Sequence, residues 1–536
     1  MGGVLDCDRL IAALEEYRNG IIANSHSADS MNVVRNELFE QCCLAGENEP
    51  SGLFTLTAPT GAGKTLAMLA FALYHAKKQG KRRIIFVLPF LSIIEQNAEV
   101  YRKICSETLE IHSQTEYPEE MREMSDRFDA PIIVTTSVRF FETLFRNKPR
   151  DCRCLHNFSD SVIIFDEAQT LPIGLAKATL QSVNALCGMF NSTVVFSTAT
   201  QPPFQYINGL QWQPREITRE KDRLFSATKR TALKMDISHP KSFEEIAEEI
   251  CVLDSVCCIV NKKAHSYTLF QLVNESDPES CFHISTDLCA AHRKRVVGEI
   301  RRRLSEGKPC RVVSTSCIEA GVDLDFKNIF RALAPLEAIV QSAGRCNRNG
   351  CLSGESGNVT VFLPKGIDGE KSMYPTEWYG FAAETVRVVA SRHPIDIDNP
   401  GHIEEYYRTL FPFSESDKKL DDAISDFDFS QVSKQYKFID NSAVNILVPY
   451  SECIEEYNSL KREAVEKGIN NSWVRRAAHL SVTSYDRDTV DRVCEAVRFA
   501  KGDSAYSGWY ILNDSRFYDD KAGFHIDSDS CPDYIL

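Results

Sequence analysis

Residues 56–75 read LTAPTGAGKTLAMLAFALYH, and they place a glycine turn, a lysine and a threonine in the order that a phosphate-binding loop needs. The loop matches the pattern G-x-x-x-x-G-K-[ST], with Ala58 in place of the first glycine. Gly61 and Gly63 would let backbone N–H groups turn toward phosphate oxygens, and the following helix start adds partial positive charge. A chance glycine-rich turn is the alternative, but the strand-like run before the loop and the helical pattern after it favour a nucleotide site. The expected nucleotide contacts are Ala58, Pro59, Thr60, Gly61, Ala62, Gly63, Lys64 and Thr65.

A pair of carboxylates follows an apolar run in SVIIFDEAQ, about a hundred residues further on. We expect Asp166 to hold Mg²⁺, directly or through water, and Glu167 to orient and deprotonate the attacking water. Lys64 would reach the β- and γ-phosphates, and the Thr65 hydroxyl would be a second ligand of Mg²⁺. Acidic residues commonly end strands, so this run is a weak signal alone. Beside the glycine loop it predicts a site that hydrolyses ATP with Mg²⁺.

The elements that must position these residues alternate between strand-like and helix-like segments. Five continuous apolar runs are expected as strands: 52–59, 82–90, 131–136, 161–168 and 192–200. Continuous runs of this kind are typical of central strands in a parallel sheet covered on both faces. A helical pattern follows the glycine loop and ends at Gly80, a residue suited to a helix C-terminus. This alternation predicts a doubly wound α/β domain.

The same alternation of strand-like and helix-like segments is found in the second part of the chain. Further strands are expected at 256–260, 281–285, 311–316, 329–335 and 359–364. The sequence therefore predicts two tandem RecA-like doubly wound α/β domains, followed by an acidic, proline-punctuated connector and a last block. The expected division is an N-terminal helical lead-in (1–30), a first RecA-like domain that binds ATP (31–220), a second RecA-like domain (221–370), a linker (371–435) and a C-terminal accessory domain (436–536).

Seven motifs in order make the chain resemble the superfamily-two helicases, over about residues 30–365. They are APTGAGKT (58–65), VLPFLSIIEQ (87–96), TTSVRFFETLF (135–145), DEAQ (166–169), STAT (197–200), STSCIEAGVDLDF (314–326) and QSAGRCNRNG (341–350). STAT alone carries almost no information, whereas the ordered set is very specific.

This resemblance implies roles for residues outside the glycine loop. Arg345 and Arg348 would act as arginine fingers from the second domain, which would link hydrolysis to domain closure. A solvated helix face is the alternative for this pair. Gln341 and Gln169 would be hydrogen-bonding sensors, Gly321 and Asp323 would approach the nucleotide, and Ser197 and Thr198 would couple the two domains.

Within the superfamily, DEAQTLP, PFLSIIEQN, QSAGRCNR and the late NILVPY resemble the helicase of type I CRISPR systems, most of all subtype I-C. The resemblance implies a motor that moves 3′ to 5′ along single-stranded DNA, with a surveillance complex carrying guide RNA as its partner. That family usually carries an N-terminal HD nuclease. Here about thirty residues precede the motor, and none of the 12 histidines is followed by aspartate. We therefore expect no nuclease site in this chain, and a separate HD nuclease acting in trans or a truncated chain.

The DNA path is expected on phosphate-contacting positions that the resemblance implies, namely Pro89, Thr136, Ser137 and Thr315. Two basic runs, HRKR (292–295) and RRR (301–303), could add phosphate contacts. A solvated charged face is an equal alternative for both runs. Arg35 could contact adenine or be an ordinary helix arginine.

Bulk properties set the limits. The chain has 536 residues, a formal net charge of −14 and 19 scattered cysteines, which fits a cytoplasmic protein with reduced thiols. No apolar run approaches the length of a membrane span, so we expect no membrane association. An RNA helicase or another remodelling ATPase of the same superfamily is the alternative function. An adaptor that uses ATP only as a switch is a third possibility.

Overall fold

The computed structural model describes residues 4–23, 29–112, 115, 117, 119–319, 322–348, 350, 356–367, 370–438, 443–499 and 506–525. The chain forms two compact units, each assembled from separate stretches of sequence. Unit 1 contains Met1–Leu233, Pro335–Ser356 and Phe381–Ile439, and unit 2 contains Lys234–Ala334, Gly357–Gly380 and Asp440–Leu536.

Unit 1 is built on a seven-stranded sheet with the order β3-β4-β2-β5-β6-β1-β7, in which neighbouring strands are parallel. Its strands are β1 (Leu53–Thr57), β2 (Arg83–Leu88), β3 (Leu109–Ile111), β4 (Ile132–Thr136), β5 (Ser161–Asp166), β6 (Thr193–Thr198) and β7 (Arg215–Glu216). The five strands expected from apolar runs are all present, which confirms the doubly wound α/β fold of this part. The sequence does not predict β3 and β7, because three and two residues are too few to show a pattern.

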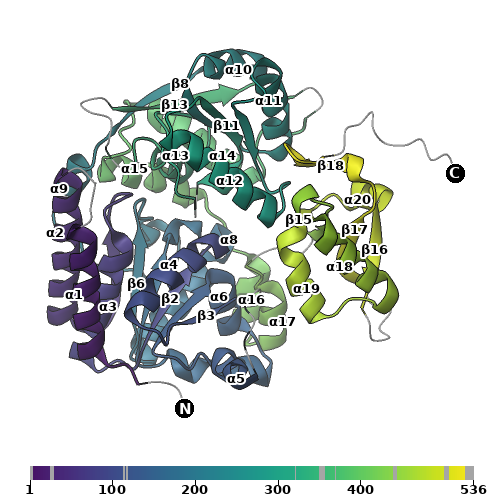
Figure 1. Cartoon of the computed structure of the whole chain (residues 1–536). Helices are drawn as coiled ribbons and strands as arrows, with labels where there is room; N and C mark the ends of the chain where they lie inside the picture. The colour runs from purple at the N-terminus through teal and green to yellow at the C-terminus, as the bar shows by residue number, and fades with distance from the viewer. Residues whose placement is uncertain are drawn as a thin grey trace. The chain divides into compact units, whose positions relative to one another are not determined.

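Helices cover both faces of this sheet (Figure 1). They include α1 (Cys7–Ala23), α2 (Asp29–Asn48), α3 (Lys64–Gln79), α4 (Leu91–Ile104), α5 (Glu119–Arg127), α6 (Ser137–Phe145), α7 (Pro149–Cys152), α8 (Ile173–Met189) and α9 (Lys221–Ala227). Helix α13 (Leu336–Ala343) also belongs to unit 1. On one face, residues of α1 to α4 share an apolar core with Phe54 and Leu56 of β1. Thr55 and Thr57, which alternate with them, donate hydrogen bonds to Glu216 of β7. This alternation is the one expected along a strand.

Helix α3 begins directly after the glycine loop and ends where the sequence predicts. Gly80 has φ 64°, and its N–H donates to the carbonyl of Ala76. Helix α2 packs closely on α3: a β-carbon at Gly46 would lie 2.8 Å from the carbonyl oxygen of Phe71. Only glycine allows this approach of one helix backbone to the other.

The segment 371–435, expected as a linker, is instead helical. It contains α14 (Glu377–Ala390), α15 (Pro400–Leu410), α16 (Lys418–Ser425) and α17 (Phe429–Gln435), and from Phe381 onward it packs in unit 1. The proline and aspartates that suggested a linker stand at helix starts: Pro400 begins α15, and Asp417 and Asp428 cap α16 and α17. Buried residues at helical spacing on α15, such as Ile403 and Tyr407, supply the apolar face that the sequence reading undervalued.

Unit 2 contains a six-stranded sheet with the order β10-β11-β9-β12-β13-β8. Its elements are β8 (Thr231–Lys241), α10 (Phe243–Cys251), β9 (Ser255–Ile259), α11 (Lys263–Ser276), β10 (Cys281–Ile284), α12 (Ala290–Ser305), β11 (Cys310–Ser314), β12 (Asn328–Ala332) and β13 (Gly357–Pro364). The pairs from β10 through β13 are parallel, and all five strands expected in this region are present. The second α/β sheet is therefore confirmed.

The last part of unit 2 has its own mixed sheet and apolar core, as expected for an accessory region. It consists of β14 (Val444–Leu447), α18 (Ile454–Lys467), α19 (Asn471–Ala477), β15 (Ser481–Ser484), α20 (Arg487–Val493), β16 (Cys494–Arg498), β17 (Tyr506–Leu512), β18 (Tyr518–Asp519) and β19 (Gly523–Phe524). Trp473 and Trp509 contact each other inside this core.

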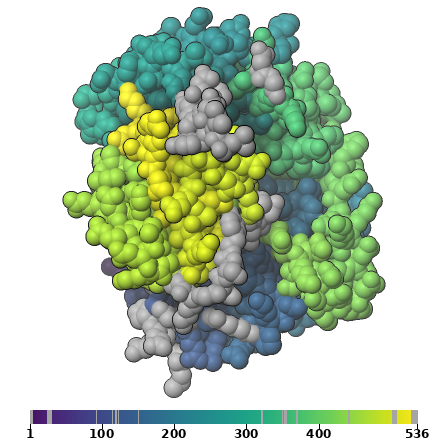
Figure 2. Space-filling model, turned by 90° about the vertical axis from the view of Figure 1, so that its right-hand side faces the viewer, coloured from purple at the N-terminus to yellow at the C-terminus, as the bar shows by residue number. Residues whose placement is uncertain are grey.

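The β18–β19 hairpin lies against the parallel-sheet part of unit 2, and Figure 2 shows these yellow residues beside the teal ones. Tyr518 Oη accepts a hydrogen bond from the N–H of Cys289 at 3.1 Å, and the Ala522 carbonyl lies 3.2 Å from His283 Nδ1. None of the helices in the described ranges is both long and apolar enough to cross a membrane.

Candidate nucleotide-binding site

The glycine loop joins the carboxyl end of β1 to the start of α3. Gly61 and Gly63 both adopt the left-handed conformation, with φ of 84° and 78°, which side chains with a β-carbon disfavour. The N–H of Ala58 donates to the Thr198 carbonyl at 3.2 Å, so the loop is tied to β6. Gly63 is the N-cap residue of α3 and has no side chain to cap the helix, which leaves the first N–H groups suited to an anion.

Lys64 and Thr65 are the first two residues of α3. The Lys64 ammonium is buried, lies 3.8 Å from Glu167 Oε1, and has no hydrogen-bond partner among the described residues. Thr65 Oγ1 donates a long hydrogen bond of 3.4 Å to Asn97 Oδ1 on α4. A buried ammonium without acceptors is costly, and oxygens of an anionic ligand would supply them.

Asp166 is the last residue of β5, and Glu167 follows it. Burial raises the pKa of Asp166 to about 6, while Lys64 acts in the opposite direction. Its Oδ1 atom is also without a hydrogen-bond partner in the part of the chain that the structure describes. Glu167 has φ 53° and ψ 51°, a left-handed conformation that costs about 1–2 kcal/mol for a residue with a β-carbon. Strain of this kind is concentrated at functional positions.

Amide side chains hold the carboxylate of Glu167. Gln169 Nε2 donates to Glu167 Oε2 at 2.7 Å, and Gln341 Nε2 of α13 donates to the same oxygen at 3.4 Å. Gln169 Oε1 in turn accepts a hydrogen bond from Thr198, which ends β6 beside the buried Ser197. A continuous chain of hydrogen bonds therefore runs from β6 to this carboxylate.

The turn after α13 lies against the glycine loop. A β-carbon at Gly344 would come within 3.2 Å of Thr60 Oγ1, so the contact is close. Arg345 and Arg348 follow in the same turn and are both half-buried. The structure thus brings the arginine pair and the glycine loop together within unit 1.

Arg35 of α2 lies on the glycine loop itself. Its Nε atom donates to the Gly61 carbonyl at 3.1 Å, and its side-chain carbons pack within 3.3 Å of the β-carbon position of Gly63. Burial lowers the pKa of Arg35, and the charge of Arg348 lowers it further. Two guanidinium groups so close together favour an anion between or beside them.

Arg230 is a contact that the sequence analysis missed. Both of its terminal nitrogens donate to the Thr60 carbonyl at 3.2 Å, and Nη2 also donates to Thr60 Oγ1 at 3.2 Å. The Arg230 carbonyl accepts a hydrogen bond from Asn347 Nδ2 at 3.2 Å. A single arginine before a strand carries no motif, so only the tertiary structure reveals its contact with the loop.

These features fit a nucleoside triphosphate and a divalent cation. Lys64 and Asp166 present a buried ammonium nitrogen and a buried carboxylate oxygen that lack partners among the described residues. The Lys64 ammonium is suited to phosphate oxygens. The Asp166 carboxylate, together with the Thr65 hydroxyl, is suited to Mg²⁺.

Three of the expected nucleic-acid contacts lie together at the carboxyl ends of β2 and β4 in the unit 1 sheet. Leu88 of β2 pairs with Thr136 of β4, which places Pro89 next to Thr136 and Ser137. Thr136 Oγ1 caps α6 by accepting the N–H of Arg139 at 2.9 Å.

The remaining expected residues belong to unit 2. Thr315 is buried and its hydroxyl donates to Cys317 Sγ at 3.4 Å. Asp323 is exposed. Gly321 lies outside the described residues.

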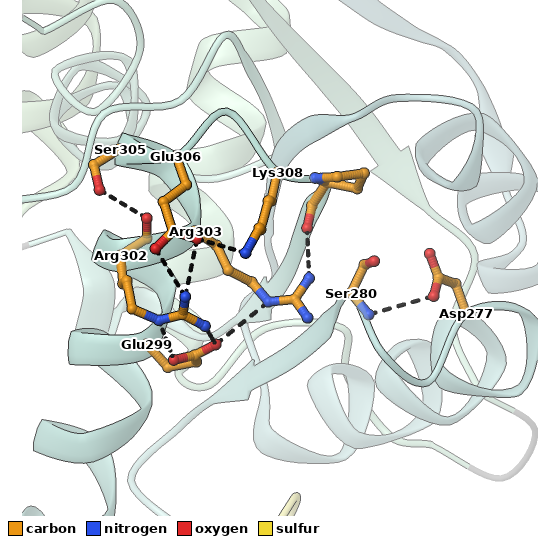
Figure 3. A network of polar contacts seen from close by, with 9 residues as sticks. Asp277, Ser280, Glu299, Arg302, Arg303, Ser305, Glu306 and Lys308 are labelled. Carbon is orange, nitrogen blue, oxygen red and sulfur yellow. Dashed lines mark hydrogen bonds and ion pairs between the residues drawn. The ribbon is translucent and has the colours of Figure 1, made fainter.

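The RRR run is engaged with carboxylates. Figure 3 shows Arg302 between Glu299 and Glu306, at 2.6 and 2.9 Å, and Arg303 turned toward Glu299 at 3.4 Å. In the HRKR run, His292 is buried, with its two ring nitrogens 3.0 Å from Tyr518 Oη and the Asp520 carbonyl. The ion pairs favour the alternative of a solvated charged face for the RRR run, whereas His292 of the HRKR run is packed inside unit 2.

Comparison with known families agrees with this geometry. A family model described as DEAD/DEAH box helicase matches residues 40–206, which contain the glycine loop, DEAQ and STAT. The fold and the candidate site are thus similar to those of ATP-dependent helicases of the DEAD/DEAH class. A second model, the C-terminal part of the CRISPR-associated nuclease/helicase Cas3, matches residues 253–351. The chain is therefore similar to the helicase part of CRISPR-associated Cas3 proteins.

Individual Cas3 proteins show the same similarity. A CRISPR-associated nuclease/helicase Cas3 of Haloferax volcanii is 23% identical over 494 residues, covering 68% of this chain and 53% of that protein. A second, of Methanothermobacter thermautotrophicus, is 23% identical over 372 residues, covering 62% and 43%. The chain spans about half the length of the curated relatives it matches.

The crystal structure of T. fusca Cas3 with AMPPNP is similar in fold, with a TM-score of 0.67 at 15% identity over 92% of this chain and 70% of that one. A chain of a CRISPR RNA-guided surveillance complex in a pre-nicking state has a TM-score of 0.60 at 15% identity, over 90% and 69%.

Proposed function

We propose that this chain is an ATP- and Mg²⁺-dependent motor that translocates 3′ to 5′ on single-stranded DNA and unwinds target DNA in type I CRISPR interference. The observation that carries the proposal is the arrangement around Lys64 and Asp166. The Lys64 ammonium and the Asp166 Oδ1 atom are buried without hydrogen-bond partners among the described residues, and the strained Glu167 follows Asp166.

The roles of the site residues follow from this arrangement. Lys64 and the loop N–H groups bind the β- and γ-phosphates, and Thr65 and Asp166 hold Mg²⁺, which neutralises charge on the phosphates when bound. Glu167 accepts the proton of the attacking water. Gln169 and Gln341 both donate to its Oε2 atom, which leaves the Oε1 atom to accept the proton. Arg345 and Arg348 stabilise negative charge on the transferred phosphoryl group. Ser197 and Thr198 relay the state of the site to the rest of unit 1, and Gly321 and Asp323 approach the nucleotide from the second RecA-like domain.

The DNA strand is proposed to cross Pro89, Thr136 and Ser137 on unit 1 and Thr315 on unit 2, held mainly through its phosphates. The proposed motor domains are the two RecA-like domains at 31–220 and 221–370. Residues 221–233 and 335–356 of the second range pack in unit 1. The proposed partner is a surveillance complex with guide RNA in the cytoplasm, and a separate HD nuclease would degrade the displaced strand.

Stimulation of ATP hydrolysis tests the choice of nucleic acid. The chain is assayed with single-stranded DNA and with RNA of the same length and sequence, and we expect the DNA to stimulate more strongly. Equal or greater stimulation by RNA would support the alternative, an RNA helicase of the same superfamily.

Strand displacement on duplexes with a 3′ or a 5′ single-stranded tail tests the direction and the motor itself. We expect ATP-dependent unwinding from the 3′-tailed duplex. Hydrolysis without displacement of either duplex would instead indicate an ATP-controlled adaptor. Lys64→Ala, which should abolish turnover, is the control for contaminating ATPases.

A further inference from the structure

The turn between α16 and α17 and the first residue of α17 present two phenylalanine side chains to solvent. Phe427 is 77% exposed and Phe429 is 69% exposed. Figure 2 looks onto the side of unit 1 where the green residues of this segment form part of the surface. A pair of large exposed aromatic residues two positions apart is a feature that folding by itself does not favour.

The two helices around this turn are firmly attached to unit 1. Leu420 of α16 and Val432 of α17 are buried, and Lys177 of α8 lies 2.9 Å from Asp421. Tyr436, just after α17, shares a hydrogen bond of 2.8 Å with Thr179 of α8. The turn is therefore held on a rigid base, and its phenylalanines are not part of the apolar contact that holds it.

The backbone of the turn makes the position of Phe427 more unusual. The N–H of Phe427 donates to the Ile424 carbonyl at 3.2 Å, and the N–H of Asp428 donates to the Ala423 carbonyl at 3.0 Å. These two bonds form a Schellman motif, in which the residue after the C-cap adopts the left-handed conformation and is usually glycine. Phe427 occupies that position with φ 56°. A residue that strains the backbone and gains no burial points to a role other than folding.

The surroundings of the two rings are acidic. Residues 415–428 contain six carboxylates and two lysines. Asp426 and Asp428 flank Phe427 directly, and both are exposed. Nucleic acid, an anionic membrane and a second copy of this same surface would all be repelled by this charge. A protein surface with lysine or arginine around an apolar pocket is complementary to it.

We propose that Phe427 and Phe429 are the anchors of a docking site for a protein partner that offers an apolar pocket rimmed by basic residues. Because the chain is proposed above to work with a CRISPR surveillance complex, the partner is taken to be a protein subunit of that complex, and this identification rests on the proposed function. Aromatic side chains inserted into a pocket supply most of the binding free energy, and the aspartates speed association.

The test is the binding of the full chain, labelled with a fluorophore, to the purified surveillance complex with guide RNA and bound target DNA. Phe427→Gly should leave the melting temperature unchanged or raise it, since glycine suits the turn, and the double variant with Phe429→Ser should bind at least about 10-fold more weakly. Met189→Ser, at an 83% exposed apolar residue near the end of α8, is the matched control and should bind as the unmodified chain does. Asp426→Asn should slow association at low salt and have little effect at high salt.

Unchanged affinity of the double variant would overturn the proposal, and so would failure of the unmodified chain to bind the complex. The same holds if the phenylalanines prove necessary for binding to anionic vesicles or to free DNA and not to the complex. Single-stranded-DNA-stimulated ATP hydrolysis is measured on the same preparations. If hydrolysis is absent while binding to the complex depends on Phe427, the proposed motor is contradicted and the docking site is supported. If hydrolysis is normal while binding to the complex does not depend on Phe427, the motor is supported and the docking site is contradicted.

Discussion

Glu167 combines a left-handed backbone, two amide donors on one carboxylate oxygen and a lysine 3.8 Å from the other. The hydrogen bonds leave Oε1 on the side of Lys64, and this is the oxygen that could accept a proton from water. Asp166 beside it is buried and has a raised pKa. The two neighbouring carboxylates therefore differ in environment, which is the condition for two different roles.

Glu167→Gln should lower ATP turnover by about 10²–10⁴-fold while nucleotide binding persists, because the amide keeps the shape of the side chain and cannot accept the proton. Turnover is measured in the presence of single-stranded DNA, and binding with a fluorescent ATP analogue. Turnover at the level of the unmodified chain would mean that Glu167 is not the base.

Nucleotide binding should depend on pH through Asp166. Its pKa is raised from 3.8 to about 6 in the folded chain, so the carboxyl group is protonated below about pH 6, whereas Mg²⁺ needs the ionised form. The apparent affinity for Mg²⁺ with ATP should therefore fall by about 10-fold for each pH unit below 6. Mg²⁺ titrations of nucleotide binding between pH 5 and 8 measure this, and a flat profile would contradict it.

The raised pKa of Asp166 also makes the stability of the folded chain depend on pH. A carboxyl group whose pKa is higher in the folded than in the unfolded chain favours folding when protonated, and this contribution is lost as the pH rises through about 6. Asp166→Asn should therefore raise the melting temperature of the nucleotide-free chain at pH 7.5 and abolish Mg²⁺-dependent hydrolysis. A lower melting temperature would contradict the assignment of burial as the cause.

Arg230 should act as a positioning residue of the glycine loop. Arg230→Met removes the hydrogen bonds to Thr60 and should raise KM for ATP by about 10-fold with a smaller effect on kcat, and Arg230→Lys should restore part of the loss. Arg223→Met is the matched control, because Arg223 is exposed and pairs with Glu220 and Glu37 at the surface. A lowered melting temperature with unchanged KM would show that Arg230 has only a structural role.

Among the elements, α2 determines how the loop is supported, since it packs on α3 and carries Arg35. Gly46→Ala would place a methyl group 2.8 Å from the Phe71 carbonyl oxygen and should destabilise unit 1 by about 1–3 kcal/mol. On α1, a β-carbon added at Gly20 would have no neighbouring atom within 4 Å. Gly20→Ala should therefore stabilise unit 1 by about 0.5–1 kcal/mol. Thermal unfolding of the two variants measures the difference, and equal melting temperatures would contradict the packing argument.

Most elements could be predicted from the sequence because each buried strand is a continuous apolar run. The helices of 371–435 could not, because prolines and aspartates serve equally well in linkers and at helix starts, and only burial distinguishes the two uses. β3 and β7 could not be predicted because their pairing partners, and not their own residues, define them.

For the whole molecule, the net charge of −14 means that the proposed DNA binding must depend on a local group of basic residues and not on general attraction. We expect the concentration of single-stranded DNA that half-stimulates ATP hydrolysis to rise with salt, with a log–log slope of about 2 or steeper. Hydrolysis is titrated with DNA at salt concentrations from 50 to 200 mM, with saturating ATP at each. Independence from salt would exclude binding dominated by phosphate contacts.

The order of the motifs, the types of residue in them and the apolar runs before them determined the fold class and the candidate nucleotide site, because each is a local pattern of the chain. The tertiary structure decided the contacts between distant segments: Arg230 and the Gly344 turn on Thr60, Arg35 on Gly61, and Gln341 on Glu167. It also decided that Arg302 and Arg303 form ion pairs with carboxylates and that two phenylalanines remain exposed at and beside a strained turn. These features depend on which side chains burial brings together, and one-dimensional spacing carries no information about that.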